Sequence, residues 1–228
     1  MKHVKFATDA NYYPFEYFSS TKEIKGFDID IAQAICYEMN ITCTVEHHHF
    51  DGLLLTLRFK RYDAVIAALD ITSKRLKQVD FSESYYKTAP VFISQQQDQA
   101  LSLTGKFIGV QANSSNHNYL IRYNKNNSYI VPYFSSSEAL ADLQQKKIDV
   151  VFSDFAVADD FLKKQNTPQE FIISHTEEVF IDSFSQGYGI AVRKGNDELR
   201  ELINEGLQTI IENGTYDQIY QRYFSQHY

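Results

Sequence analysis

The sequence predicts an α/β protein of two domains, and three observations lead to that prediction. Short apolar stretches alternate with stretches of helical spacing along most of the chain, which is typical of α/β proteins. A glutamine-rich polar run at 95–99 cannot build a core, and the same alternation restarts beyond it. The chain has 228 residues, which is enough for two modest domains.

The first half of the chain supplies the elements of one domain. Apolar residues recur at helical spacing after Gly26, at Ile31 and Ile35, so we expect a helix to begin there. The other expected elements are strands at 4–7, 43–45, 64–68 and 89–94 and helices at 53–59 and 72–78.

The second half repeats this pattern. The final helices, at 197–213 and 216–224, need a sheet to pack on, and the first domain is the more economical host. We therefore expect the chain to cross twice, with residues 1–90 and 187–228 in one lobe and 91–186 in the other. The remaining expected elements are strands at 107–110, 129–131, 150–152, 171–173 and 188–193, helices from Ser115, at 136–144 and at 154–163, and a loop at 177–185.

The composition excludes several function classes. The chain has a formal net charge of −7 and no basic run, so nucleic acid and anionic membrane surfaces are poor partners. Hydrophobic residues make up 43% of it, which supports real cores. No segment approaches the roughly 20 apolar residues of a membrane span. The 16 Tyr and 17 Phe predict aromatic cores and supply candidates for the walls of a ligand pocket.

The N-terminus and the two cysteines leave the compartment open. Met1, Lys2 and His3 lead directly into an apolar strand, so the protein is either cytosolic or a trimmed form with an added Met. Cys36 stands near a helix end and Cys43 begins the next strand, a spacing that permits a bridge. Two free thiols in a cytosolic protein are an equal alternative.

The segment at 67–75 is suited to bind a carboxylate. Thr72 is a good helix N-cap, so Arg75 falls in the first turn of the helix. The amides of that turn and the guanidinium fork of Arg75 would both favour an anion. An ordinary surface turn with a solvated arginine fits this segment equally well.

Competing motifs for metal, cofactor or catalysis are weak. His47, His48 and His49 are consecutive on a strand, so their side chains alternate and cannot converge on one ion. Gly187 and Gly189 lack the third glycine and the helix of a dinucleotide loop. The serine-hydrolase, zincin and phosphate-loop motifs are absent. We therefore expect no metal, no cofactor and no enzymatic activity.

Seven motifs stand in the order and spacing of one known family. They are DANYYPFE at 9–16, GFDIDIA at 26–32, DAVI at 63–66, DITSKR at 70–75, GKFIGV at 105–110, IDVV at 148–151 and NGTY at 213–216. Over nearly its full length the chain resembles the polar amino-acid-binding proteins of bacterial ABC importers, solute-binding protein family 3. It is most similar to the arginine- and lysine/arginine/ornithine-binding members.

The resemblance implies a type II periplasmic binding protein fold, in which two α/β lobes close on a ligand about crossing strands near 89–94 and 185–192. It also implies a disulfide between Cys36 and Cys43 and a periplasmic or lipid-anchored extracytoplasmic location, the signal peptide having been removed. The implied partner is the permease of an ABC transporter, and the implied state is a monomer.

The resemblance further assigns the groups that bind the head of an amino acid. Arg75 would hold the ligand carboxylate, with the backbone amide of Thr72 or Asp70 and the hydroxyl of Ser115. Asp154 would pair with the ammonium, although a plain helix N-cap is its simpler role and both can coexist. Asp70 is interpreted as a second ammonium acceptor, and Ala68 is a further expected ligand-binding residue.

The resemblance likewise places a cationic side chain in the pocket. Tyr12 and Phe50 match two aromatic walls, although either ring alone is more often core. A guanidinium between two rings gains about 0.5 to 2 kcal/mol of cation–π attraction. Asp9 matches the acidic partner of the cation, and Glu16 and Gln111 are further acceptors. L-Arginine is the first expected ligand, followed by lysine, ornithine and histidine.

One departure and two rival functions remain. Many relatives have Gly-Thr-Thr where this chain has Asn113, Ser114 and Ser115, and Asn adopts positive φ less readily than Gly. The same fold also serves periplasmic cyclohexadienyl dehydratases and the sensor domains of receptors. A dehydratase needs a proton donor aimed at a ring substrate, and the acidic pocket expected here argues against it.

Overall fold

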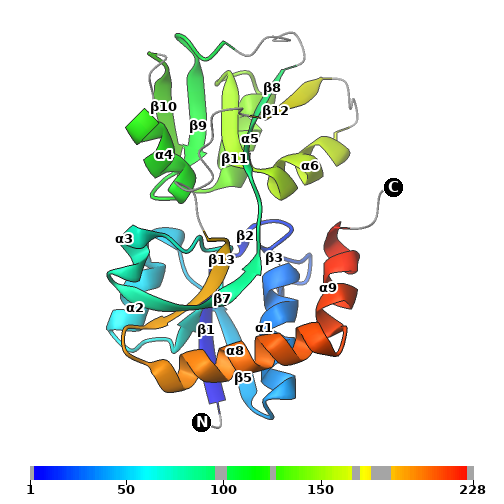
Figure 1. Cartoon of the computed structure of the whole chain (residues 1–228). Coiled ribbons are helices and arrows are strands. Elements are labelled where there is room, and N and C mark those ends of the chain that lie inside the picture. Colours follow the sequence, from blue (N-terminus) through cyan, green and yellow to red (C-terminus); the bar gives the residue numbers. More distant parts are fainter. Residues whose placement is uncertain (1–2, 96–101, 124–126, 166–169, 176–185, 225–228) are drawn as a thin grey trace. The chain divides into compact units, whose positions relative to one another are not determined.

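A computed structural model of the chain contains two compact units (Figure 1). It describes residues 3–95, 102–123, 127–165, 170–175 and 186–224. Unit 1 comprises residues 1–87 and 185–228, and unit 2 comprises residues 88–184. Most of the predicted polar run at 95–99 and the whole predicted loop at 177–185 lie outside the described residues. Within the described ranges, every helix is too short or too polar to span a bilayer.

The sheet of unit 1 is mostly parallel and confirms the predicted α/β class. Strands β5, β1 and β6 run parallel, and β13 runs antiparallel to its neighbours β6 and β7. In spatial order the strands are β5 (Thr42–His47), β1 (His3–Thr8), β6 (Ala64–Val65), β13 (Tyr188–Arg193) and β7 (Val79–Tyr86).

Helices from both ends of the chain pack on this sheet. Helix α2 (Leu53–Arg58) packs against β1, β6 and β13, while α8 (Asp197–Glu212) packs against α1 (Phe27–Glu38). Gly206 permits that close packing, because a Cβ there would lie 2.7 Å from Cγ2 of Ile35. The two final helices therefore return to unit 1, as Figure 1 shows in orange and red. The other helices of this unit are η1 (Phe50–Gly52), α3 (Ser73–Leu76) and α9 (Thr215–Phe224).

An aromatic cluster fixes α9 to the rest of unit 1. The rings of Phe27 and Phe224 lie 5.0 Å apart, and Tyr216 donates its hydroxyl to the carbonyl of Tyr85 at 2.6 Å. Aromatic pairs of this kind add stability beyond the area that they bury. The cluster explains much of the high Tyr and Phe content, and its other members are Phe15, Tyr86, Tyr188, Tyr220 and Tyr223.

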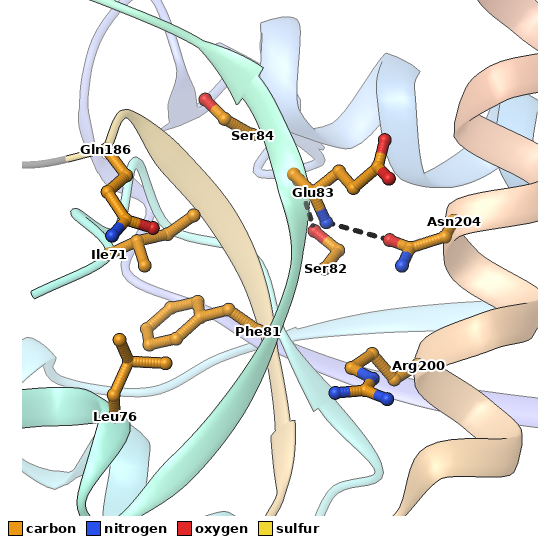
Figure 2. Close-up of a pocket in the computed structure, with 9 residues that line it drawn as sticks. All are labelled: Ile71, Leu76, Phe81, Ser82, Glu83, Ser84, Gln186, Arg200 and Asn204. Atoms are coloured by element: carbon orange, nitrogen blue, oxygen red, sulfur yellow. Dashed lines mark hydrogen bonds between the residues drawn. The ribbon is translucent and has the colours of Figure 1, made fainter.

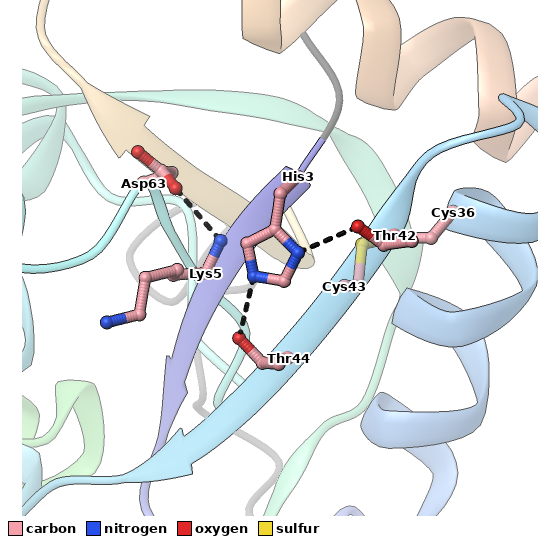
Figure 3. Close-up of a disulfide and its surroundings, with 7 residues drawn as sticks. All are labelled: His3, Lys5, Cys36, Thr42, Cys43, Thr44 and Asp63. Carbon is pink, nitrogen blue, oxygen red and sulfur yellow. Dashed lines mark hydrogen bonds between the residues drawn. A yellow bond between two sulfur atoms is a disulfide. The ribbon is translucent and has the colours of Figure 1, made fainter.

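The predicted disulfide is present. Cys36 near the end of α1 is bonded to Cys43 at the start of β5 (Figure 3). Figure 3 also shows His3 of β1, whose two ring nitrogens are hydrogen-bonded to the hydroxyls of Thr42 and Thr44 at 2.8 and 3.2 Å. These contacts fasten the first strand to its neighbour at the amino end of the sheet.

Unit 2 is a second α/β layer structure. Strands β9 and β11 run parallel in its centre, and β8 runs antiparallel to both β11 and β12. Its core joins Phe92, Ile108, Val150 and Phe152. The strand order is β10 (Tyr129–Tyr133), β9 (Phe107–Gln111), β11 (Val150–Asp154), β8 (Pro90–Gln95) and β12 (Phe171–His175), with helices α4 (Ser115–Tyr123), α5 (Ser136–Gln144) and α6 (Phe155–Lys163).

Sequence reasoning missed one strand and a small sheet. Strand β7 at the edge of the unit 1 sheet has a register shift against β13, so its polar and apolar residues do not alternate regularly. At this irregularity the hydroxyl of Ser82 accepts the backbone N–H of Ile190 at 2.9 Å, so a side chain satisfies the strand's hydrogen bond there. The short antiparallel sheet of β2 (Asn11–Tyr12), β3 (Glu16–Phe18) and β4 (Ile24–Lys25) was also not predicted.

Candidate functional site

The candidate residues of unit 1 follow the carboxyl ends of its parallel strands. Asp9 comes directly after β1, and Ala68 lies three residues after β6. His47, which was not a candidate from the sequence, ends β5. In open α/β sheets, ligands bind beyond these carboxyl ends. The topology of the sheet therefore brings residues far apart in the sequence to one edge.

Asp9 is a deeply buried carboxylate. Its residue is 2% exposed, and one oxygen accepts the side-chain amide of Asn11 at 2.8 Å. The backbone N–H of Phe50 also donates to it, and His47 Nδ1 lies 3.7 Å from Oδ1. Burial raises the pKa of Asp9, and these hydrogen bonds and the nearby histidines oppose that rise.

Arg75 packs near the ring of Phe50. Its guanidinium carbon is 5.7 Å from the centre of the Phe50 ring, and one N–H donates to the carbonyl of Asp70 at 2.9 Å. Thr72 is the N-cap of α3, as predicted, and accepts the backbone N–H of Arg75 at 3.3 Å. Burial lowers the pKa of Arg75, and the charge of Asp70 opposes this.

Asp9 and Arg75 are thus linked through Phe50. The backbone of Phe50 donates to the acid, and its ring packs against the guanidinium. Phe50 was predicted as a wall for the ligand side chain, and contact with Arg75 is a further role that the sequence did not reveal. Tyr12, the other predicted wall, is buried on β2 and stacks on Phe15 at 5.9 Å.

Unit 1 also contains a pair of buried carboxyl groups, one on β3 and one on α1. Glu16 and Asp28 are 1% and 0% exposed, and they form a side-chain hydrogen bond with each other. Burial and the charge of Asp28 raise the pKa of Glu16 well above its ordinary value. Glu16 is therefore the member of the pair that more strongly favours the protonated form. Its expected role as an acceptor for a guanidinium stays a prediction, and the structure gives its carboxyl a different neighbour.

Asp28 shapes the segment that carries the predicted head-group site. Its Oδ2 accepts the backbone N–H of Ala68 and the hydroxyl of Tyr85, both at 2.7 Å. Ala68 has a φ of 44°, a left-handed conformation that is costly for a residue with a Cβ. The predicted strand at 64–68 accordingly ends at Val65. Asp28 was not singled out from the sequence, because a carboxylate inside a helix gives no such signal.

In unit 2, the candidate residue Asp154 is the last residue of β11. This residue is 6% exposed and occupies the N-cap position of α6, yet its side chain makes no capping hydrogen bond. The side-chain amide of Asn116 lies 3.4 Å from its Oδ1. Asn116 is buried on α4, and no sequence pattern pointed to it.

The turn before α4 adopts the geometry that glycine would favour. Asn113 has a φ of 60°, and its backbone N–H donates to His117 Nδ1 at 3.1 Å. Ser114 accepts the N–H of His117 at 3.0 Å and donates to the carbonyl of Gln111 at 2.7 Å. The hydroxyl of Ser114 is thus engaged in the turn, which leaves Ser115, half-buried at the first position of α4, as the candidate ligand donor.

A surface groove in the described part of unit 1 is lined by none of the candidate residues. This groove of about 340 Å³ lies in unit 1 beside β7 and α8 (Figure 2). Asn204 accepts the backbone N–H of Glu83 there at 2.8 Å, which covers part of the edge of β7. The groove therefore belongs to the packing of α8 on the sheet edge.

The comparisons with known proteins agree with one another. A family model for bacterial extracellular solute-binding proteins, family 3, matches residues 4–226. ABC transporter arginine-binding protein 1 of Escherichia coli (strain K12) is 39% identical over 226 residues, which are 98% of this chain and 91% of that protein.

Two solved structures resemble the chain over almost their full lengths. An ancestral arginine-binding protein bound to arginine has a TM-score of 0.89 at 32% identity, covering 98% of this chain and 99% of its own. A Salmonella typhimurium periplasmic binding protein described for its high arginine specificity has a TM-score of 0.88 at 35% identity, covering 98% and 100%.

Proposed function

The chain belongs to family 3 of the bacterial extracellular solute-binding proteins, and we propose that it binds a basic L-amino acid and delivers it to the permease of an ABC importer. L-Arginine is the first ligand, because the relatives described above are arginine-binding proteins. Lysine, ornithine and histidine follow. The protein works in the periplasm as a monomer, and it carries out no catalysis.

The buried carboxylate of Asp9 is the observation that carries this proposal. Its neighbour of opposite charge among the described ion pairs is His47, and burial lowers the pKa of that histidine. A buried carboxylate without a permanent cation costs several kcal/mol, on the order of the penalty for burying an ion. A ligand guanidinium or ammonium at Asp9 would offset that cost.

Other groups suit the head of the amino acid. Arg75 is half-buried and donates one hydrogen bond to Asp70, so the rest of its fork is available to a ligand carboxylate. Ser115 and a backbone amide of Asp70 or Thr72 add donors. The ligand ammonium goes to Asp154, supported by Asp70. The remaining predicted ligand contacts come from Tyr12, Phe50, Ala68 and Gln111. Glu16 is a further predicted acceptor for the ligand guanidinium.

Calorimetric titration with free amino acids tests this function. We expect L-arginine to bind and to raise the melting temperature by mass action. Citrulline, which replaces the guanidinium with a neutral group of the same shape, should bind at least about tenfold more weakly. In Asp9→Asn this preference for arginine should shrink, while binding of a neutral amino acid such as glutamine should change little.

Two results would contradict the proposal. Equal affinity for arginine and citrulline would remove the cationic pocket. If no free amino acid binds in the titrations and the protein releases phenylpyruvate from prephenate, the dehydratase alternative would be established instead.

A further inference from the structure

His47 is placed to sense the charge at Asp9. It ends β5, and its Nδ1 accepts the backbone N–H of Ala10 at 3.1 Å. The same nitrogen lies 3.7 Å from Oδ1 of Asp9. Because Nδ1 accepts a hydrogen bond here, the neutral ring carries its proton on Nε2. A second proton can be added only at Nδ1, the atom that faces the carboxylate.

The surroundings of the ring are compatible with such a change. The ring of Phe18 lies 5.2 Å away and that of His49 lies 5.3 Å away. The His47 side chain is 25% exposed, so solvent protons can reach it. The charged and titratable groups that act on His47 are Asp9, His48 and His49, and the charge of Asp9 acts in turn on Glu16.

We propose that His47 is a proton-dependent gate on the cation subsite at Asp9, so that protonation of its Nδ1 releases a basic ligand. This inference rests on the proposed function, because it requires the ligand cation to pair with Asp9. The protonated ring loses the hydrogen bond from Ala10 and donates to Asp9 instead. Two cations then compete for one buried carboxylate.

The direction of the pH dependence follows from linkage. Burial lowers the pKa of His47, and the charge of Asp9 opposes that decrease. A ligand cation at Asp9 neutralises the negative charge that stabilises the protonated ring, so ligand binding lowers the pKa of His47 further. The ligand then binds more tightly to the neutral ring, and affinity falls as the pH falls through the pKa of the free protein.

Titrations at pH 7.5 and 5.5 with the wild type, His47→Asn and His3→Asn test the gate. Asparagine can still accept the N–H of Ala10 but does not titrate. His3 lies at the far end of β1 and is the matched control. Because the pKa of His47 lies below its ordinary value, we expect arginine to bind the wild type and His3→Asn severalfold, but less than about tenfold, more weakly at pH 5.5. His47→Asn should lose less than about twofold. Citrulline should show the smaller change in all three proteins.

Nitrogen NMR of the His47 ring in the wild type gives an independent measurement, should the variant fail to fold. Arginine should lower the pKa of this ring. The gate is overturned if arginine leaves that pKa unchanged, or if His47→Asn weakens with falling pH as much as the wild type does. In either case tight arginine binding at pH 7.5 would leave the proposed function intact. Absence of arginine binding at both pH values would overturn both.

Discussion

At the scale of single residues, the candidate site depends on polar groups that occupy buried positions. Asp28 accepts the backbone N–H of Ala68 and so stabilises a left-handed residue. Phe50 joins Asp9 to Arg75 through its backbone and its ring. The first contact links a predicted ligand residue to a neighbour outside the predicted ligand set, and the second links three predicted ligand residues to one another. Binding and local packing therefore use the same atoms.

Arg75→Ala should abolish most ligand binding. Truncating one partner of a buried, hydrogen-bonded charge pair costs about 2 to 5 kcal/mol, which is at least about thirtyfold in affinity. Lys74→Ala is the matched control, because Lys74 is an exposed cation on the same short helix. Calorimetry with arginine measures both variants, and unchanged affinity in Arg75→Ala would exclude the predicted carboxylate site.

The buried pair of Glu16 and Asp28 should make stability depend on pH. Both pKa values are raised in the folded protein, that of Asp28 to about 6 and that of Glu16 well above its ordinary value. The folded state therefore holds more protons than the unfolded state above a pH of about 4. The stability contributed by these protons is full below that pH and is lost as the pH rises through the folded values.

Glu16→Gln should weaken this pH dependence. Glutamine keeps a hydrogen-bond donor for Asp28 but cannot lose a proton. We expect the fall in melting temperature between pH 5 and pH 9 to be smaller in Glu16→Gln than in the wild type, as measured by calorimetry. Glu205→Gln, an exposed change on α8, should behave as the wild type. Parallel curves for all three proteins would show that Glu16 does not hold the proton.

At the scale of elements, the disulfide and the candidate residue Asp9 lie at opposite ends of the unit 1 sheet. Cys43 pairs with Val4 at the start of β1, whereas Asp9 follows the end of that strand. The bridge ties α1 to β5 across a sequence separation of 7 residues. It stabilises the amino end of the sheet without touching the candidate residues.

The double variant Cys36→Ser and Cys43→Ser should lose stability but keep ligand affinity. Closing a loop of this length contributes about 2 kcal/mol. Urea unfolding should report that loss, and calorimetry at pH 7.5 should report an arginine affinity within about twofold of the wild type. A large loss of affinity in the folded variant would mean that the amino end of the sheet controls the site.

At the scale of the whole molecule, the chain builds two cores and returns to the first. Helices α8 and α9 pack on α1 although more than 150 residues separate them in the sequence, which is about 1.5 times a typical small domain. Unit 2 forms its own five-stranded sheet in between. The sheet topology confirms the predicted α/β class, and the family match confirms the predicted family. Both could be predicted because hydrophobic periodicity and the order of motifs are properties of the sequence itself.

The sequence by itself determined the elements whose local signals agree. Helix α5 begins after Ser135, which caps it, and runs over the residues predicted. The helix at Thr72 and the alternation of strands and helices were also predicted, since caps and periodicity are local. The bridge between Cys36 and Cys43 was implied only by the family resemblance, because the spacing of the two cysteines left free thiols an equal alternative. Strand β7 was missed because its pairing with β13 is irregular and shows in three dimensions only.

Tertiary structure alone decided how the candidate residues are supported. Asp28, Asn116 and His47 lie beside Ala68, Asp154 and Asp9 respectively, although each is far from its partner in the chain. No local pattern encodes such a contact, because a carboxylate or an imidazole has the same sequence signal whether it is solvated or buried. Their burial and pairing arise only when the strands are placed side by side, and that placement sets the charge of the site.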